Sequence, residues 1–286
     1  MDLRFLESLV AVVEAGSIAA AARREKLTAA AVSQRVQALE RELGCALLVR
    51  TAHAARPTEA CLALLPRARR LLREAALLKE DVAGGALRGE LAVGAISTVL
   101  TGLMPEALDA LGRAAPDLRL QLIPGSSLQL YEALTRGALD AAVLVAPPFA
   151  LPKGLVGHPL RTEPLVLLSR VPVAPAEVEA AIMAAPVIRY DPASWGGRLA
   201  ADYLAARRLH PEVRCDLDAL ETIALLVARG MGHALVPAWP GLAAAGVHIC
   251  RVPDAAPFAR RIVCLHPALP ARARALEALI AALAAV

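Results

Sequence analysis

The sequence predicts an α+β multidomain protein: a winged helix-turn-helix domain, a long linker helix and a two-lobed α/β domain. Three patterns support this fold class. Residues 16–42 have the spacing of two short helices joined by a tight turn. Residues 59–82 keep a helical period, Gly84-Gly85 then marks a boundary, and residues 88–286 alternate strand and helix signals. We therefore expect the three parts to span residues 1–58, 59–87 and 88–286.

The composition is that of a cytoplasmic protein rather than a membrane protein. The 286 residues are enough for several domains with buried cores. Hydrophobic residues make up 57% of the chain, but many are alanines, and the longest uncharged runs (residues 91–105 and 231–247) are broken by Gly or Pro. The first residues, MDLRFLESL, carry an acid and lack the pattern of a signal peptide.

The cysteines do not predict a metal or cofactor site. Five of them, at positions 45, 61, 215, 250 and 264, have no CxxC or Cys/His ligand spacing. Buried, reduced thiols are the simplest expectation. Cys215 is the one candidate for redox sensing, which would need an accessible thiol of low pKa.

The positive charge is concentrated near the N-terminus. Residues 1–88 contain 14 Lys/Arg against 10 Asp/Glu, whereas residues 89–286 contain 17 of each. The whole excess of +4 therefore lies in the part with the helix-turn-helix. This placement favours contact with phosphate groups.

The helix-turn-helix follows from apolar spacing and capping residues. Residues 2–15 form a first helix with one buried stripe, and Gly16 ends it. Ser17 and Thr28 are expected to cap the second and third helices by accepting backbone N–H bonds. In the third helix Val32, Val36 and Leu39 should face inward.

The outward face of the third helix suits contact with base edges in double-stranded DNA. It carries small and polar residues, with Arg35 beside them: Ala29, Ala30, Ser33, Gln34 and Gln37. Gln can bond adenine, Arg can bond guanine, and an alanine methyl can contact a thymine methyl. The alternative is a solvated face of an ordinary three-helix bundle.

A two-stranded wing and a long helix should follow. Gly44 ends the third helix, and two short strands place Arg50 and Arg56 where they could contact phosphate or a minor groove. Thr58 can cap the next helix. Along it the apolar residues keep a heptad spacing: Leu64, Ala68, Leu71, Ala75, Leu78 and Val82. This pattern favours a homodimer through residues 59–87, although the helix could instead pack on its own domain.

Residues 88–286 should form two α/β lobes built from parallel βαβ units, with a ligand cleft between the lobes. The expected lobes are about residues 88–161 plus 266–286, and residues 162–265. Hydroxyl side chains follow two strands of the first lobe, and further polar and aromatic side chains follow a strand of the second. These candidate ligand contacts are Ser97, Thr98, Ser126, Ser127, Tyr190, Asp191 and Trp195. Hydroxyls and free N–H groups at helix starts suit a carboxylate or phosphate. They could also be helix caps alone.

The sequence contains no catalytic motif. GxSxG, HExxH, a P-loop and a dinucleotide fingerprint are all missing, and the six histidines are scattered. We therefore expect a binding protein rather than an enzyme. A DNA-binding regulator and a solute-binding module without a DNA role remain as alternatives, and the lack of a signal peptide favours the regulator.

The first 60 residues closely resemble the N-terminal domain of LysR-type transcriptional regulators. The matching landmarks are Glu14 to Ser17, Ala21-Ala22, Ala31 to Ser33, Leu39-Glu40, Leu43-Gly44, Leu47, Arg50-Thr51 and Thr58-Glu59. The resemblance continues more loosely through GSSLQLYEALTRGALDAAVLV and LVARGMGHALVP. It implies an effector domain like type 2 periplasmic binding proteins. It also implies a dimer of dimers, a homotetramer that binds and bends DNA in the nucleoid.

Carried over by position, the resemblance implies specific contacts. The expected groove contacts are Thr28, Ala30, Ser33, Gln34 and Arg35, with Arg50 on the wing and Ser97, Thr98 and Ser126 in an effector pocket. The family's Gln-Pro at the start of the recognition helix is Ala29-Ala30 here, and its Ser-Arg-Gln triplet reads Ser33-Gln34-Arg35, which should shift base preference. The AVSQR and ALLVRT runs are similar to the branch that controls basic amino acid export. A carboxylate or an amino acid, including an arginine- or lysine-type one, is the expected effector.

Overall fold

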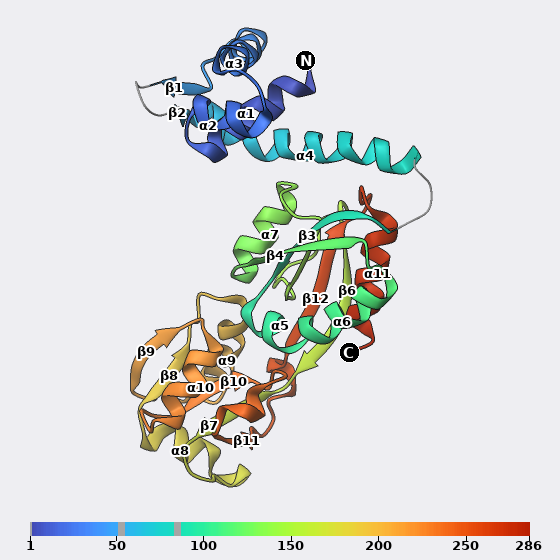
Figure 1. The fold of residues 1–286 in the computed structure, drawn as a ribbon. Helices are drawn as coiled ribbons and strands as arrows, with labels where there is room; N and C mark the ends of the chain where they lie inside the picture. The colour runs from blue at the N-terminus through green and yellow to red at the C-terminus, as the bar shows by residue number, and fades with distance from the viewer. Residues whose placement is uncertain (1, 51–54, 83–86) are drawn as a thin grey trace. The chain divides into compact units, whose positions relative to one another are not determined.

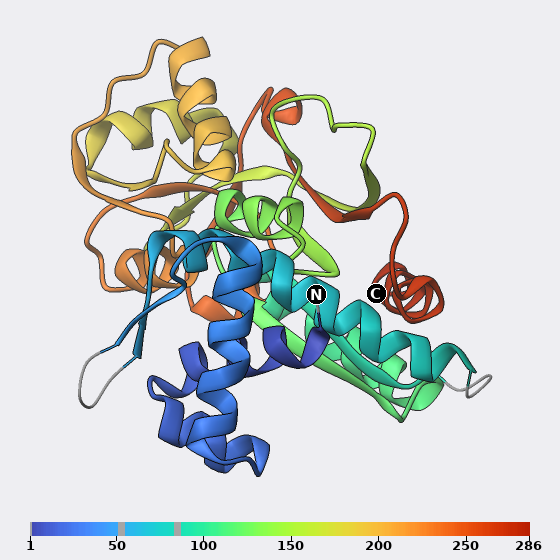
Figure 2. The same cartoon turned by 90° about the horizontal axis from the view of Figure 1, so that it is seen from above.

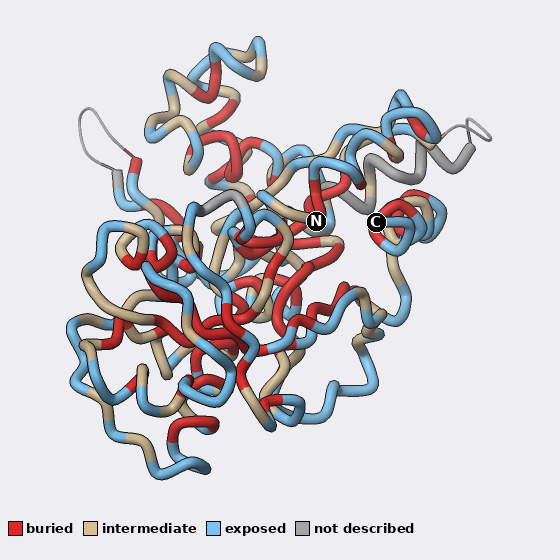
Figure 3. The backbone as a smooth tube through the Cα atoms, turned by 90° about the horizontal axis from the view of Figure 1, so that it is seen from below, coloured by how far each residue is buried: buried red, intermediate tan, exposed pale blue. Residues whose placement is uncertain are grey.

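The computed structural model describes residues 2–50, 55–82 and 87–286 (Figure 1). Their contacts divide the chain into two compact units. One is built mainly from residues 1–85, and the other from residues 86–135 and 139–286. Each unit has hydrophobic core clusters of its own, and the buried positions are red in Figure 3.

Three helices form the body of the first unit: α1 Leu3–Ala15, α2 Ile18–Glu25 and α3 Ala29–Leu43. The predicted caps are present, because Ser17 Oγ accepts the Ala20 N–H at 3.2 Å and Thr28 Oγ1 accepts the Ala31 N–H at 3.2 Å. Gly16 ends α1 with a φ of 70°, in the left-handed region that favours glycine. The sequence pattern therefore determines these helix boundaries locally.

A short hairpin follows α3. Its strands, β1 Leu48–Arg50 and β2 Ala55–Pro57, pair antiparallel and run side by side in Figure 2. Val49 and Arg56 are register partners, and both are exposed. The hairpin lies where the wing was predicted, and residues 51–54 between its strands are outside the described part of the chain.

The helix α4 Glu59–Val82 begins at the cap that the sequence predicted, with Thr58 Oγ1 accepting the Cys61 N–H at 3.2 Å. Its first half packs on the core of its own domain through Cys61, Leu65 and Ala68, all of which are buried. The prediction that Ala68 lies on an open heptad seam is wrong, because Ala68 is buried in the core of its own domain. Leu71, in contrast, remains 36% exposed. The side chains of Leu78 and Val82, the last two seam positions, lie outside the described residues.

The first lobe of the second unit is a five-stranded sheet in the order β4-β3-β5-β12-β6. The strands are β3 Gly89–Ala95, β4 Leu118–Pro124, β5 Ala141–Val145, β6 Leu155–Glu163 and β12 Arg260–Pro267. The helices are α5 Ser97–Gly102, α6 Met104–Ala114, α7 Ser127–Thr135 and α11 Ala273–Ala284. Helix α6 packs against α11, and α7 packs on β3 and β5.

The second lobe contains two small sheets that an isolated bridge between Val187 and His233 joins. Its strands are β7 Leu165–Ser169, β8 Val187–Tyr190, β9 Val213–Leu217, β10 Ala234–Pro237 and β11 His248–Arg251. Its helices are α8 Val178–Ala184, α9 Trp195–Ala206 and α10 Leu220–Ala228, with 3₁₀ turns at Pro175–Glu177, Leu242–Ala245 and Ala256–Phe258. Strand β7 pairs antiparallel with β10 and β11, whereas β8 and β9 are parallel.

The structure corrects two predictions for this unit. Strand β12 pairs antiparallel with β5 and β6, so residues 260–265 belong to the first lobe and not to the second. For the same reason the sheets are mixed rather than built only from parallel βαβ units. Between β3 and β4 the chain forms two helices, α5 and α6, which meet at Leu103, because Pro105 lacks an N–H and favours the first turn of a new helix.

Candidate functional site

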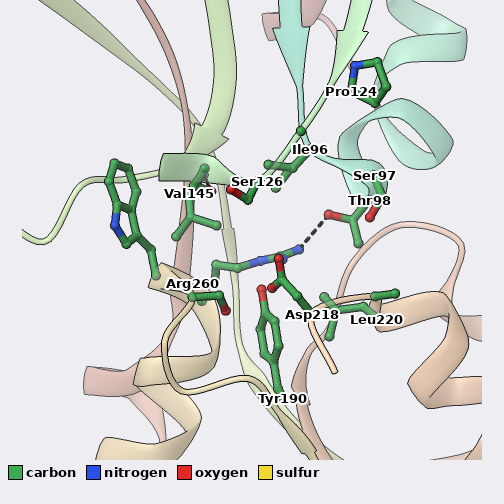
Figure 4. Close-up of a pocket in the computed structure, with 16 residues that line it drawn as sticks. Ile96, Ser97, Thr98, Pro124, Ser126, Val145, Tyr190, Asp218, Leu220 and Arg260 are labelled. Atoms are coloured by element: carbon green, nitrogen blue, oxygen red, sulfur yellow. Dashed lines mark hydrogen bonds between the residues drawn. The ribbon is translucent and has the colours of Figure 1, made fainter. Parts of the chain in front are cut away.

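A cavity of about 290 Å³ lies between the two lobes of the second unit (Figure 4). Its walls come from the starts of four helices: α5, α7, α9 and α10. The starts of α5 and α10 have no side-chain cap, and their N–H groups give this pocket a positive electrostatic bias. Six of the seven residues predicted as ligand contacts line it: Ser97, Thr98, Ser126, Ser127, Tyr190 and Trp195.

The sequence reasoning missed the main charged group of this pocket, which is Arg260. The side chains of Arg260 and Glu163 are each 2% exposed and form an ion pair, with 2.5 Å between Nη2 and Oε2. Arg260 Nη2 also donates to Thr98 Oγ1 at 3.1 Å, shown by the dashed line in Figure 4. Burial raises the pKa of Glu163 above its usual range, and the Arg260 charge partly offsets this shift.

The Arg260–Glu163 pair lies where the chain passes between the lobes. The two residues are register partners at the end of β6 and the start of β12. The sequence signal was a charged residue beside each of two apolar strands. Because the two charges are 97 residues apart, the sequence does not indicate that they pair. An arginine at the edge of an otherwise apolar strand was the observation that could have found it.

Tyr190, Asp218 and Arg260 converge in this pocket (Figure 4). Tyr190 is 5% exposed, and its burial raises the pKa of the phenol, so the hydroxyl stays protonated. Gly196 makes room for it, because a Cβ at that position would overlap the Tyr190 hydroxyl. Asp218 adds a carboxylate that the sequence reasoning did not single out.

The pocket hydroxyls also bond within the protein. Ser126 Oγ accepts the Gln129 N–H at 3.3 Å, while Gln129 Oε1 accepts the Ser126 N–H at 3.0 Å, so Ser126 belongs to a reciprocal cap of α7. Ser127 Oγ accepts the Val145 N–H at 3.2 Å. Ser97 Oγ bonds Glu221 of the second lobe at 3.3 Å. The hydroxyls are thus fixed in position beside the cavity.

Asp191 is the predicted contact that does not line the pocket. Its Oδ1 accepts the Ala193 N–H at 2.9 Å, and its carbonyl accepts the Ser194 hydroxyl at 2.9 Å. Ser194 in turn caps α9 by accepting the Gly197 N–H at 3.1 Å. Asp191 therefore shapes the turn that leads into α9, which keeps its carboxylate out of the cavity.

In the first unit, α3 presents a polar face to solvent. Ala30, Gln34 and Gln37 are exposed as expected, and so is Thr28 at the start of the helix. Arg41 extends this face by one turn and was not predicted; its Nε donates to the Gln37 carbonyl at 3.4 Å. Ser33 is partly buried beside it and has an interaction within the protein.

The structure contradicts the placement of Arg35 on the outward face. Its guanidinium lies 3.4 Å from Ser8 Oγ and 3.9 Å from Glu25 Oε2, and its side chain is only 24% exposed. At 100° per residue, position 35 lies roughly 60° from the centre of the buried stripe, close enough to turn inward. Arg56 of the wing is exposed, whereas the side chain of Arg50 lies outside the described residues.

Other reactive groups give little sign of a further centre. The described residues include no group of three or more His, Cys, Asp or Glu side chains placed to hold a metal ion. Burial raises the pKa of the Cys61, Cys250 and Cys264 thiols, to about 12 for Cys264. Cys215, the candidate redox thiol, is partly exposed in β9 and forms no disulfide. No helix in the described part of the chain is long and apolar enough to cross a membrane.

A winged helix-turn-helix, a long helix and a bilobed domain with a pocket define the class of ligand-responsive DNA-binding regulators. Residues 3–62 match the bacterial regulatory helix-turn-helix protein family model, lysR family, and residues 84–286 match the LysR substrate binding domain. The chain therefore belongs to the LysR family. It is a LysR-type DNA-binding transcriptional regulator with an effector-binding domain.

Curated relatives and solved structures agree with this assignment. The chain is 30% identical to the nitrogen assimilation regulatory protein nac of Klebsiella aerogenes, over 83% of this chain and 78% of that protein. It is 28% identical to the regulator TtuA of Agrobacterium vitis, over 92% of each.

Two full-length structures share the fold. An OxyR variant from Pseudomonas aeruginosa has a TM-score of 0.71 at 24% identity, covering 99% of this chain and 94% of that one. CbnR complexed with its target DNA has a TM-score of 0.67 at 23% identity, covering 99% and 100%.

Proposed function

We propose that a small carboxylate bound in the interlobe pocket controls DNA binding by this protein. The observation that carries the proposal is the buried Arg260 guanidinium, fixed by Thr98 and Glu163 among four helix starts. A ligand carboxylate can accept from the Tyr190 hydroxyl, the Thr98 hydroxyl and the free N–H groups of these helices. The charge of Glu163 offsets that of Arg260, so the net positive charge of the pocket is small. Hydrogen bonds therefore contribute to holding the ligand carboxylate as much as charge does.

An amino acid is the favoured subclass of carboxylate. Asp218 lines the same cavity as Arg260, so an ammonium group on the ligand would have an anionic partner. A thermal-shift screen of the full chain should compare each amino acid with its deaminated acid and its decarboxylated amine. Amino acids should stabilise the protein most and the amines least. Stabilisation by amines alone would contradict the carboxylate assignment.

We propose that the exposed face of α3 contacts the bases. Gln34 and Gln37 offer amide groups that can bond adenine, and Ala30 leaves room for a close approach. Ser33 borders this face, Thr28 begins it, and the wing residues Arg50 and Arg56 would contact phosphate or a minor groove. Because Arg35 bonds within the domain, base reading depends on the glutamines. A gel shift that shows no preference for the protein's own promoter over random DNA would contradict this role and favour a solute-binding module.

We propose a homodimer through α4, arranged as a dimer of dimers on DNA. One observation supports the dimer: Leu71, which lies in the second half of this amphipathic helix, is 36% exposed. Since Ala68 packs on its own domain, the contact surface would depend on the second half of the helix. We also propose that the protein acts in the cytoplasm, at the nucleoid. It would regulate by binding rather than by catalysis.

A further inference from the structure

A second cavity, of about 360 Å³, lies in the first lobe between the loop after β5 and the β6–β12 strand pair. Its floor is apolar, because Val263 and Leu265 of β12 are buried. Its outer wall comes from the loop, where Phe149 is 47% exposed and Leu151 is 36% exposed. Gly157 keeps the floor open, since a Cβ there would lie 3.0 Å from the side chains of both Leu151 and Leu265.

Two cations line this largely apolar cavity, Arg161 of β6 and Arg261 of β12. Arg261 alternates with Val263 and Leu265 along β12, so its side chain lies on the same face of the sheet. Its register partner, Thr162, adds a hydroxyl beside it. Arg261 is exposed, and within the described chain its guanidinium makes no ion pair or side-chain hydrogen bond. The pocket therefore offers an apolar floor and, at Arg261, a positive charge that no carboxylate of the described chain pairs with.

We propose that this cavity is a second ligand site, which takes a medium-chain carboxylate. The alkyl chain lies on Val263 and Leu265 under Phe149, and the carboxylate pairs with Arg261 and accepts from Thr162. Guanidinium and carboxylate match in geometry, and apolar pockets with a few polar groups bind amphipathic small molecules. The two pockets share no lining residue, although β12 contributes to both, and this site prefers a ligand with an apolar body.

The two cavities share an aromatic contact. Phe149 stands edge-to-face with Trp195, at 5.7 Å between ring centroids and 88° between planes, and Trp195 lines the interlobe pocket. Tyr131 of α7 completes the cluster, with its ring 5.3 Å from Phe149 and 5.8 Å from Trp195. A ligand under Phe149 thus affects a wall of the other pocket, and coupling of this kind is reciprocal. This coupling, unlike the second site itself, rests on the proposed function of the interlobe pocket.

Fluorine NMR can observe the second site directly, because the chain has only three phenylalanines. The full chain is labelled with 3-fluorophenylalanine, and Phe149→Leu assigns one resonance. Titration with octanoate should shift the Phe149 resonance to saturation and leave those of Phe5 and Phe258 in place. An unmoved Phe149 resonance at saturating octanoate would overturn the proposal.

Charge variants locate the carboxylate. Arg261→Gln should weaken octanoate binding by about tenfold, the loss expected for one charge-assisted pair. The matched control is Arg214→Gln, which removes an exposed arginine on β9 and should leave affinity unchanged. 1-Octanol should bind more weakly than octanoate. Equal affinities for both variants would overturn the proposal, and so would a titration that Thr98→Val abolishes, because octanoate would then occupy the interlobe pocket.

Discussion

Glu163→Gln removes one charge of the buried ion pair at the crossing between the lobes. Both partners are 2% exposed, so the variant leaves the Arg260 guanidinium without a counter-charge in a place that water does not reach. Breaking such a pair typically costs about 3–5 kcal/mol of unfolding free energy. For a domain of this size, that corresponds to a drop in Tm of roughly 6–20 °C.

Asp216→Asn is the matched control. Asp216 and Arg189 form an ion pair of nearly the same length, 2.6 Å, in the same unit, but their side chains are 47% and 36% exposed. An exposed pair contributes about 0–1 kcal/mol, so this variant should barely change stability. The comparison therefore isolates burial as the cause, since the two pairs are alike in chemistry and distance.

Urea unfolding followed by tryptophan fluorescence is the assay. Both tryptophans, Trp195 and Trp239, belong to the second unit, so the signal reports that unit alone. Pairing Glu163→Gln with Arg260→Met should recover part of the loss, because the uncompensated charge is then removed. If Glu163→Gln cost no more than Asp216→Asn, the structural role assigned to the buried pair would be wrong.

Four further variants test the DNA-contacting face, the dimer and the interlobe pocket. Gln34→Ala should change base preference by about 1–3 kcal/mol at one position of the DNA site, whereas Arg35→Ala should lower the Tm of the first unit without changing that preference; binding selections from random DNA check both. Leu71→Asp should reduce the mass seen by light scattering to that of a 29.9 kDa monomer, and an unchanged mass would refute dimerisation through α4. Gly196→Ala should displace the Tyr190 hydroxyl and weaken effector binding by calorimetry, while gel shifts show unchanged affinity for DNA without effector.

Local features of this fold were readable from the sequence. Ser17, Thr28 and Thr58 cap helices because their side chains each accept an N–H group three residues away, which spacing alone predicts. The buried stripe of α3 likewise follows from helical period. The pocket hydroxyls were found for the same reason, since each follows directly on the end of a strand.

The errors involve residues whose partners are distant in the sequence. Strand β12 was assigned to the wrong lobe because its neighbours, β5 and β6, lie more than 90 positions earlier. Arg260 was missed for the same reason, because its role depends on Glu163 and Thr98. Arg35 lies between the buried and exposed faces of α3, so only the positions of Ser8 and Glu25 decide its direction.

Measuring promoter binding with and without effector tests whether a ligand in the interlobe pocket controls DNA binding. Fluorescence anisotropy would follow binding of the full chain to its own promoter, with and without the amino acid that the thermal-shift screen identifies. This ligand should change the affinity for the promoter in the wild-type protein and should fail to do so in Thr98→Val. A ligand response of equal size in Thr98→Val would contradict control through the interlobe pocket.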